Sequence, residues 1–324
     1  MLYIFFSILI STFLSFLIIK ISNRFQIYDL PESRRLNKIS TPRYGGLAIS
    51  LNLFILSYLS GISIYPILIS SIILISLVIF DDIFKLKNYL RLCCQIIAIV
   101  PSIISLYYSN SSQNIFFLFF MVLFMISFIN LSNFFDGINT ILITQFILII
   151  IHNSYLINEE FLKFDAINLS LLSSSLVFLL FNFLNKLFMG DIGSYFIGFY
   201  SSYKLFEIGL TKGNQFFILS LFSMIPLLAD TILTLLIRVK NKERFFSTPH
   251  KQHAYQLLVQ LGFKHWQVSL IYSFKTILFC MISIVLLKLN FGFNIQFLIL
   301  IFLGALNSLF ILQVRRKAYL KGLI

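Results

Sequence analysis

A series of apolar stretches, each close to the length of a membrane-spanning helix, constrains the fold more than any other feature of this sequence. Hydrophobic residues make up 59% of the 324 positions and charged residues only 11%, which is more apolar surface than one soluble core could bury. A helix needs about 20 apolar residues to cross the hydrocarbon core of a bilayer. The sequence therefore predicts an all-α polytopic membrane protein with about 10 or 11 transmembrane helices, in a single integral-membrane domain over residues 1–324. The predicted spans are residues 2–19, 46–60, 64–80, 92–108, 115–131, 138–151, 166–184, 194–210, 215–237, 266–287 and 294–313.

The basic residues predict how the chain is oriented. Lys20, Arg24 and four further basic residues, the last of them Arg43, follow the first stretch directly, and basic loops stay in the cytoplasm. The N-terminus is therefore expected outside and, after an odd number of spans, the C-terminus in the cytoplasm. Most of the 25 Lys and Arg residues fall in loops on that inner side, so topology explains much of the net charge of +13. No nucleic-acid-binding motif accompanies this charge, and no nucleic-acid partner is expected.

The acidic residues are few and unevenly placed. Carboxylates that border hydrocarbon are costly and usually functional. A transporter would place such groups near the bilayer midplane, between two gates, whereas here they form one layer on the predicted cytoplasmic side. Such a layer suits a divalent metal and a phosphorylated substrate that arrives from the cytosol, so the active site is expected at the cytoplasmic face. The five carboxylates at or just inside predicted helix ends are Asp81, Asp82, Asp136, Asp191 and Asp230.

Two motifs place carboxylates beside other polar groups. In "FDDIFKLK", Asp81 and Asp82 would repel each other unless a cation neutralised them, and Lys85 could fold back over Asp81 if the helix continues. A structural helix end is the alternative interpretation. In "MGDIGS", glycines on both sides of Asp191 would let the backbone approach a phosphate while the carboxylate holds a metal.

The segment "NLSNFFDGIN" repeats a polar residue at every third position. If it is helical, Asn133, Asp136 and Asn139 would share about a third of the helix circumference, and Asn130 begins the series. Such amides and carboxylates on an apolar helix need polar partners. Caps between two spans are the alternative.

Basic and histidine-bearing loops complete the candidate site. His250 and His253 are three positions apart in "PHKQHAYQ" and would share a helix face if Pro249 opens a helix. They could donate to a pyrophosphate, although two histidines in a basic loop are more often solvated. Lys38 and Arg43 in "KISTPRYGG" could seat a lipid phosphate, and a positive-inside anchor is the alternative.

Taken in order, these segments resemble the polyprenyl-phosphate N-acetylhexosamine-1-phosphate transferases of glycosyltransferase family 4, which include the phospho-N-acetylmuramoyl-pentapeptide transferases. The matching segments, between residues 41 and 258, are "TPRYGG", "FDDIFKLK", "NLSNFFDGIN", "FMGDIGSYFIGF", "ADTILTLLIR" and "HKQHAYQLL". The ending "HKQHAYQ" is similar to the branch that initiates O-antigen and capsule synthesis, because the muramoyl-pentapeptide branch has a run of consecutive histidines there. Asn139 stands where many members have a second aspartate, and Thr140 where many have glycine.

The resemblance implies a reaction and its partners. An N-acetylhexosamine-1-phosphate would pass from a UDP-N-acetylhexosamine to polyprenyl (undecaprenyl) phosphate, with release of UMP and with Mg²⁺ or Mn²⁺ as cofactor. The product would start a lipid-linked polysaccharide in the bacterial inner membrane, among membrane lipids, and a homodimer is compatible with this. One phosphoanhydride replaces another, so catalysis is chiefly positioning and charge neutralisation.

The resemblance also implies roles for individual residues. Asp191 would be the principal metal ligand and Asp82 the second, while Asp81 would take a proton from the lipid phosphate or orient it. The implied catalytic residues are Asp81, Asp82, Asp136 and Asp191. The implied substrate-binding residues are Asn133 and Asn139 for the nucleotide, His250 and His253 for the pyrophosphate, Lys38, Arg43 and Lys85 for the phosphate path, and Asp230 and Arg238 beside them.

Three other functions remain open at this point. A phospho-N-acetylmuramoyl-pentapeptide transferase would belong to the same family. A cation-coupled transporter would account for many helices with charge inside the membrane, but it predicts inverted repeats and broken helices at the midplane, and the sequence contains neither. A catalytically silent lipid-binding scaffold would have no need of four aspartates on one side of the membrane.

Overall fold

The computed structural model describes residues 2–29, 40–109, 115–161, 163–242 and 250–324. Within them, nine helical segments are long and apolar enough to cross a membrane. One of these nine segments consists of α9 (Asn214–Leu221), the turn η1 (Phe222–Met224) and α10 (Ile225–Lys240). Two further helices, the short apolar α2 (Gly46–Leu59) and the buried α8 (Gly190–Lys212), account for the other two of the eleven predicted spans. The prediction of an all-α, multi-pass membrane protein is confirmed. The helices are α1 Leu2–Phe25, α2 Gly46–Leu59, α3 Tyr65–Phe84, α4 Asn88–Ser109, α5 Ile115–Phe135, α6 Ile141–Asn158, α7 Ala166–Phe183, α8 Gly190–Lys212, α9 Asn214–Leu221, η1 Phe222–Met224, α10 Ile225–Lys240, α11 Ala254–Gln260, α12 His265–Lys288 and α13 Phe293–Leu320.

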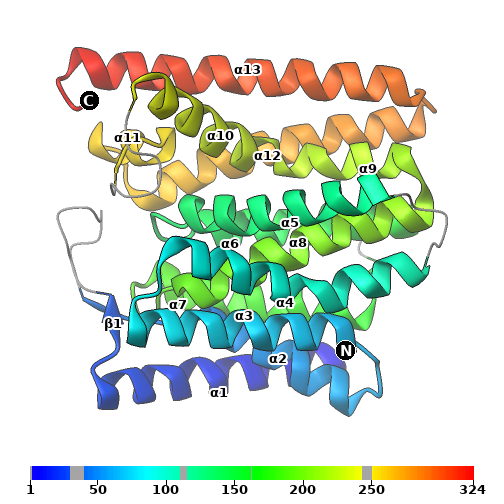
Figure 1. Cartoon of the computed structure of the whole chain (residues 1–324), viewed down its shortest axis with the longest axis vertical. Coiled ribbons are helices and arrows are strands. Elements are labelled where there is room, and N and C mark those ends of the chain that lie inside the picture. The colour runs from blue at the N-terminus through cyan, green and yellow to red at the C-terminus, as the bar shows by residue number, and fades with distance from the viewer. Residues whose placement is uncertain (1, 30–39, 110–114, 162, 243–249) are drawn as a thin grey trace.

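The long helices run side by side, and the two termini point to opposite ends of the bundle (Figure 1). Large apolar side chains cover its flanks: Phe13, Phe116 and Phe274 are 66%, 79% and 69% exposed. Water would penalise such exposure, whereas the hydrocarbon of a bilayer does not. The flanks of the bundle are therefore its lipid-facing surface.

Helix α8 runs through the centre of the bundle, and all of its residues from Ile192 to Ile208 except Glu207 are buried. Glycines at the contacts of α8 with α2 and α5 allow these helices to approach closely. A Cβ on Gly46 of α2 would lie 2.0 Å from the Cα of Gly193, and a Cβ on Gly198 would lie 2.7 Å from the Cα of Ile129 on α5. Small residues at helix contacts are how membrane helices come within backbone distance of each other. This central position explains how α8 can carry Lys204 and Glu207, which pair with each other at 2.5 Å, whereas its other two charged residues, Asp191 and Lys212, lie at the ends of the helix.

At one end of the bundle, the segment before α2 lies against the segment before α8. The short strands β1 (Tyr28–Asp29) and β2 (Thr41–Pro42) pair antiparallel. Beyond them, the main-chain amide of Phe188 donates to the carbonyl of Pro42 (2.9 Å), and the amide of Gly45 donates to the carbonyl of Phe188 (2.7 Å). These bonds bring two segments far apart in the sequence to the same place, and they fix the loop that carries Arg43 beside the start of α8.

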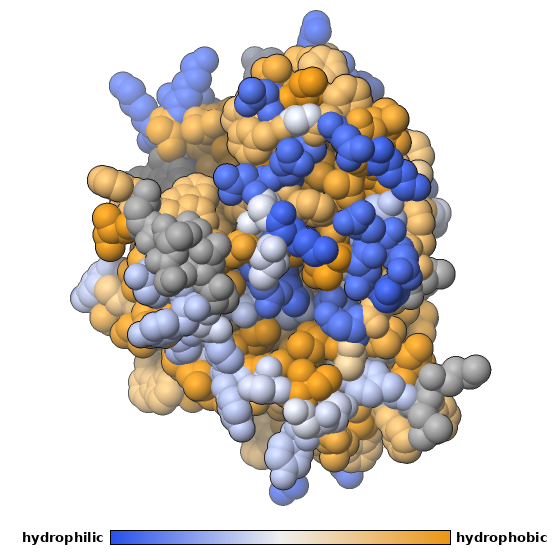
Figure 2. All heavy atoms as spheres, turned by 90° about the vertical axis from the view of Figure 1, so that its right-hand side faces the viewer, coloured by the Kyte–Doolittle hydropathy of each residue, from blue (hydrophilic) through white to orange (hydrophobic). Residues whose placement is uncertain are grey.

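The opposite end of the bundle faces the viewer in Figure 2. Hydrophilic side chains gather there between apolar flanks (Figure 2). The exposed charged residues at this end are Glu159, Glu160 and Lys163 after α6, and Lys212 and Lys288, which are the last residues of α8 and α12. Polar groups thus cap both ends of an apolar bundle, as a membrane-spanning protein requires.

Candidate active site

A pocket of about 210 Å³ opens at the end of the bundle where the segments before α2 and α8 meet. Five residues predicted from the sequence line it together, although they come from three separate segments of the chain. They are Arg43, Asn133, Asp136, Asn139 and Asp191, and the remaining lining residues are Asp29, Gly137, Ile138, Asn182, Phe188, Met189, Gly190 and Gln256.

Arg43 bridges two of the predicted aspartates. Its Nη1 lies 3.0 Å from Oδ1 of Asp82 on α3, and its Nη2 lies 3.4 Å from Oδ2 of Asp191 on α8. The hydroxyl of Tyr44 donates to the other oxygen of Asp82. Gly190 has a left-handed φ of +69°, and a Cβ there would lie 3.2 Å from Cγ of Arg43. Glycine at this position lets the start of α8 pass close to the arginine.

Asp81 is turned to a different partner from its neighbour Asp82. Its carboxylate accepts from Nη1 of Arg91 and from the main-chain amide of Leu86, both at 3.0 Å. Lys85 does not fold back over Asp81, because α3 ends at Phe84 and Lys85 takes a left-handed conformation with an exposed side chain. Neither Asp81, Asp82 nor Lys85 lines the pocket itself.

Asp136 begins a loop and does not continue α5. That helix ends at Phe135, so the helical interpretation of the repeating polar residues holds only for Asn130 and Asn133. Asn133 donates to the hydroxyl of Ser194 on α8 at 2.9 Å. Burial, together with the negative charge of Asp191, raises the pKa of the Asp136 carboxyl well above its usual value. Two carboxylates therefore face one pocket closely enough to repel each other.

The last turn of α7 and the loop after it hold the Asp136 loop in place, through residues that the sequence motifs did not identify. The main-chain amide of Thr140 donates to Oδ1 of Asn182 at 2.6 Å, and Nδ2 of Asn182 donates to the carbonyl of Leu187 at 3.0 Å. The side-chain amide of Asn139 donates to the side-chain oxygen of Asn185. An asparagine inside an apolar stretch is a signal that could have identified Asn182, because such an amide needs a polar partner.

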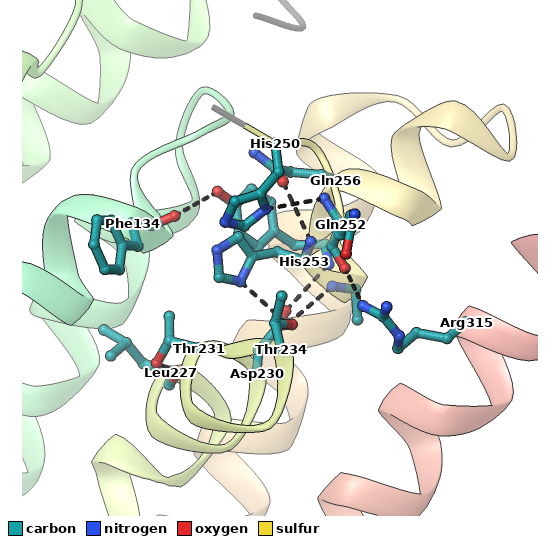
Figure 3. Close-up of polar contacts among 12 residues, drawn as sticks. Phe134, Leu227, Asp230, Thr231, Thr234, His250, Gln252, His253, Gln256 and Arg315 are labelled. Carbon is teal, nitrogen blue, oxygen red and sulfur yellow. Dashed lines mark hydrogen bonds and ion pairs between the residues drawn. The ribbon is translucent and has the colours of Figure 1, made fainter. Parts of the chain in front are cut away.

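Asp230 lies in the middle of α10 with no exposed surface, so its predicted place near a helix end is wrong. Its carboxylate accepts from the main-chain amides of Ala254 (2.9 Å) and Tyr255 (3.1 Å) and from the hydroxyl of Tyr272 (2.5 Å). A carboxylate at the first amides of a helix satisfies donors that have no partner within that helix and matches the positive end of its dipole. Asp230 thus anchors α11, as Figure 3 shows.

The two predicted histidines are neighbours, but not on a helix. Helix α11 begins at Ala254, so His250 and His253 precede it, with ring centroids 5.0 Å apart. His253 is 2% exposed and its Nδ1 lies 3.7 Å from Asp230, whereas His250 is only partly buried. On the other side, Nη1 of Arg315 on α13 donates to the carbonyl of Gln252 at 2.7 Å (Figure 3). Helices α10 and α13 therefore hold the histidine segment between them.

Besides Lys85, four further predicted substrate-binding residues do not line the pocket: Asp230, Arg238, His250 and His253. Arg238 is 2% exposed. Lys38 lies outside the described residues. What does reach the pocket from this region is Gln256, one turn into α11.

Helix α11 also supports the Asp136 loop directly. The Tyr255 hydroxyl donates to the carbonyl of Phe134 at 2.7 Å. A Cβ on Gly137 would lie only 2.2 Å from that hydroxyl oxygen. Asp230, α11 and the loop that carries Asp136 form one connected support.

The pocket suits a divalent cation that also binds phosphate. Among the described residues, no three His, Cys, Asp or Glu side chains gather closely enough to hold a metal by themselves. Mg²⁺, however, usually keeps several waters and takes one or two carboxylates plus substrate phosphates. Asp136 and Asp191 supply two carboxylates, and a cation between them would relieve their repulsion. The donor set therefore fits a magnesium site that a phosphorylated substrate completes.

Comparisons with known proteins agree with the motifs in the sequence. Residues 64–207 match the model of glycosyl transferase family 4, and this range contains Asp81, Asp82, Asp136 and Asp191. The chain is also 27% identical, over 311 aligned positions, to a protein of Bacillus subtilis (strain 168) named "Probable undecaprenyl-phosphate N-acetylglucosaminyl 1-phosphate transferase". That match covers 85% of this chain and 82% of the relative. With its motifs in order and its acidic pocket at one end of a membrane bundle, this chain is similar to the proteins of glycosyl transferase family 4 over residues 64–207.

Proposed function

We propose that this protein transfers an N-acetylhexosamine-1-phosphate from a UDP-sugar to undecaprenyl phosphate and releases UMP. One observation carries the proposal: Arg43, Asp136 and Asp191 meet in a single pocket at the end of a membrane bundle. A lipid phosphate at the membrane surface and a nucleotide from solution could both reach a pocket in that place. The family and the name of the relative support this reaction.

In the proposed reaction, an oxygen of the lipid phosphate attacks the phosphorus attached to the sugar. The bond between that phosphorus and the bridging oxygen breaks, and the bridging oxygen leaves with UMP. Bound Mg²⁺ or Mn²⁺ would neutralise charge on the transferred phosphoryl group. Asp191 and Asp136 would hold it, since both oxygens of Asp82, the predicted second ligand, are engaged by Arg43 and Tyr44.

The remaining residues of the pocket would bind and orient the substrates. Arg43 can donate to a phosphate, and Asn133 and Gln256 offer amides to the nucleotide. Asp81, fixed by Arg91, stays the candidate for orienting the lipid phosphate, and His250 for contacting the pyrophosphate. His253 is buried against Asp230, so its role would be to place His250 and α11.

The proposal is tested with purified protein in detergent, undecaprenyl phosphate, Mg²⁺ and either UDP-N-acetylglucosamine or UDP-N-acetylgalactosamine. We expect UMP and a lipid-linked sugar in equal amounts, with no UMP when the lipid or the metal is left out. Failure to release UMP with any UDP-N-acetylhexosamine would contradict the proposed function.

The same assay tests the proposed orientation, in which the pocket faces the cytoplasm of a bacterial inner membrane. Sealed inverted vesicles should use added UDP-sugar without detergent, and sealed right-side-out vesicles should not. Equal activity in both preparations would contradict a cytoplasmic pocket.

Gly137→Ala is expected to lower UMP release at least about tenfold, because the new methyl group would collide with the Tyr255 hydroxyl and displace the Asp136 loop. Tyr255→Phe removes that oxygen and should restore part of the activity in the double variant. Initial rates for the two single variants and the double variant measure this effect. A double variant that is slower than Gly137→Ala alone would contradict the predicted contact.

A further inference from the structure

Arg43 reaches across the pocket from the loop before α2 and contacts two carboxylates, which differ in their distance from it and in their exposure. Its contact to Asp82 is the closer, at 3.0 Å, and Tyr44 holds the same carboxylate. Its contact to Asp191 is longer, at 3.4 Å, and the Asp191 side chain is 37% exposed against 19% for Asp82. Partly exposed ion pairs are weak, and a guanidinium group held at one end can release the other. The contact with Asp191 is therefore the one that can open.

The charges at the pocket favour such an opening. Arg43 brings one positive charge to the carboxylates of Asp82 and Asp191, and Asp29 and Asp136 line the same pocket. One guanidinium group cannot neutralise all of these carboxylates, so Arg43 alone leaves part of the negative potential of the pocket uncompensated. A divalent cation would compensate more of it, but Nη2 of Arg43 already occupies one side of the Asp191 carboxylate.

We propose that Arg43 is an exchangeable counter-ion: it binds Asp191 when no divalent cation is present and releases Asp191 when a cation binds. The guanidinium group, still held by Asp82, then becomes available to a phosphate group in the same pocket. Cation and phosphate binding would therefore strengthen each other, each by the same factor. The second half of this proposal rests on the proposed function, whereas the competition for Asp191 does not.

Binding of Mn²⁺ to the purified full-length protein, without nucleotide or polyprenyl lipid, tests the competition. Free Mn²⁺ is measured by electron paramagnetic resonance. Arg43→Gln should bind Mn²⁺ about three- to tenfold more tightly than the wild type, which corresponds to losing one partly exposed ion pair. Arg43→Lys keeps the positive charge but replaces the planar guanidinium group by a single ammonium group, which cannot span both carboxylates in the same way. The Mn²⁺ affinity of this variant should therefore fall between those of the wild type and Arg43→Gln.

Arg91→Gln is the matched control, because Arg91 makes the same kind of ion pair at 3.0 Å, but with Asp81. Its Mn²⁺ affinity should stay within about twofold of the wild type. Unchanged or weaker binding by Arg43→Gln would overturn the proposal, and so would an equal gain in Arg91→Gln, since that would show a general effect of charge. A wild type that binds Mn²⁺ but releases no UMP would contradict the proposed function alone.

Discussion

Asp191→Asn is expected to lower the rate of UMP release by at least about a hundredfold, with little change in the fold. An amide offers a hard divalent cation one neutral oxygen, whereas the carboxylate offers two oxygens that share a negative charge. Each factor of ten in rate corresponds to about 1.4 kcal/mol of transition-state stabilisation. Asp191 lies in the first turn of α8 and faces the pocket, so the isosteric amide fits the same space. Steady-state rates over a Mg²⁺ titration measure the effect.

Glu160→Gln is a suitable control for this prediction. It also neutralises one carboxylate that is paired with a basic residue, Lys163, at 3.0 Å, but at the end of the bundle away from the pocket. Its rate should match that of the wild type. Near-normal turnover of Asp191→Asn at low Mg²⁺ would exclude Asp191 as the principal metal ligand.

Asp230→Asn is expected to destabilise the protein by about 3 kcal/mol or more and to abolish most turnover, although Asp230 does not touch the pocket. Its carboxylate accepts two main-chain amides at the start of α11 and the Tyr272 hydroxyl. An amide cannot accept all three, and its own N–H group would face a donor. Without this anchor, α11 would no longer hold Gln256 at the pocket or Tyr255 against the Asp136 loop.

Thermal unfolding in detergent and limited proteolysis around α11 measure this second effect. The matched control is Thr234→Val, which keeps the side-chain shape and removes only the 3.4 Å contact between the Thr234 hydroxyl and Asp230. It should destabilise the protein far less than Asp230→Asn. If Asp230→Asn unfolds at the wild-type temperature and α11 resists protease, then Asp230 does not anchor that helix.

The sequence by itself determined the membrane fold and most of its spans. Crossing a bilayer is a local requirement, since each stretch must be long and apolar enough to satisfy its backbone within one helix. Eleven predicted stretches therefore correspond to helical segments of the structure. Even α8, with four charged residues, was predicted, although its first turn begins at Gly190 and so includes Asp191. The motifs also identified the lining residues Arg43, Asn133, Asp136, Asn139 and Asp191, because polar groups at the ends of apolar helices stand out.

Only the tertiary structure decided which partner each of these groups has. Arg43, and not a neighbour in sequence, bridges Asp82 and Asp191, because the segment before α2 pairs with the segment before α8. Asp81 binds Arg91 where the local spacing had suggested Lys85. Asp230 looked like part of the substrate site, yet it anchors a short helix that follows it in the chain. Spacing along a chain predicts which side chains share a helix face, but a partner on another helix depends on how the helices pack.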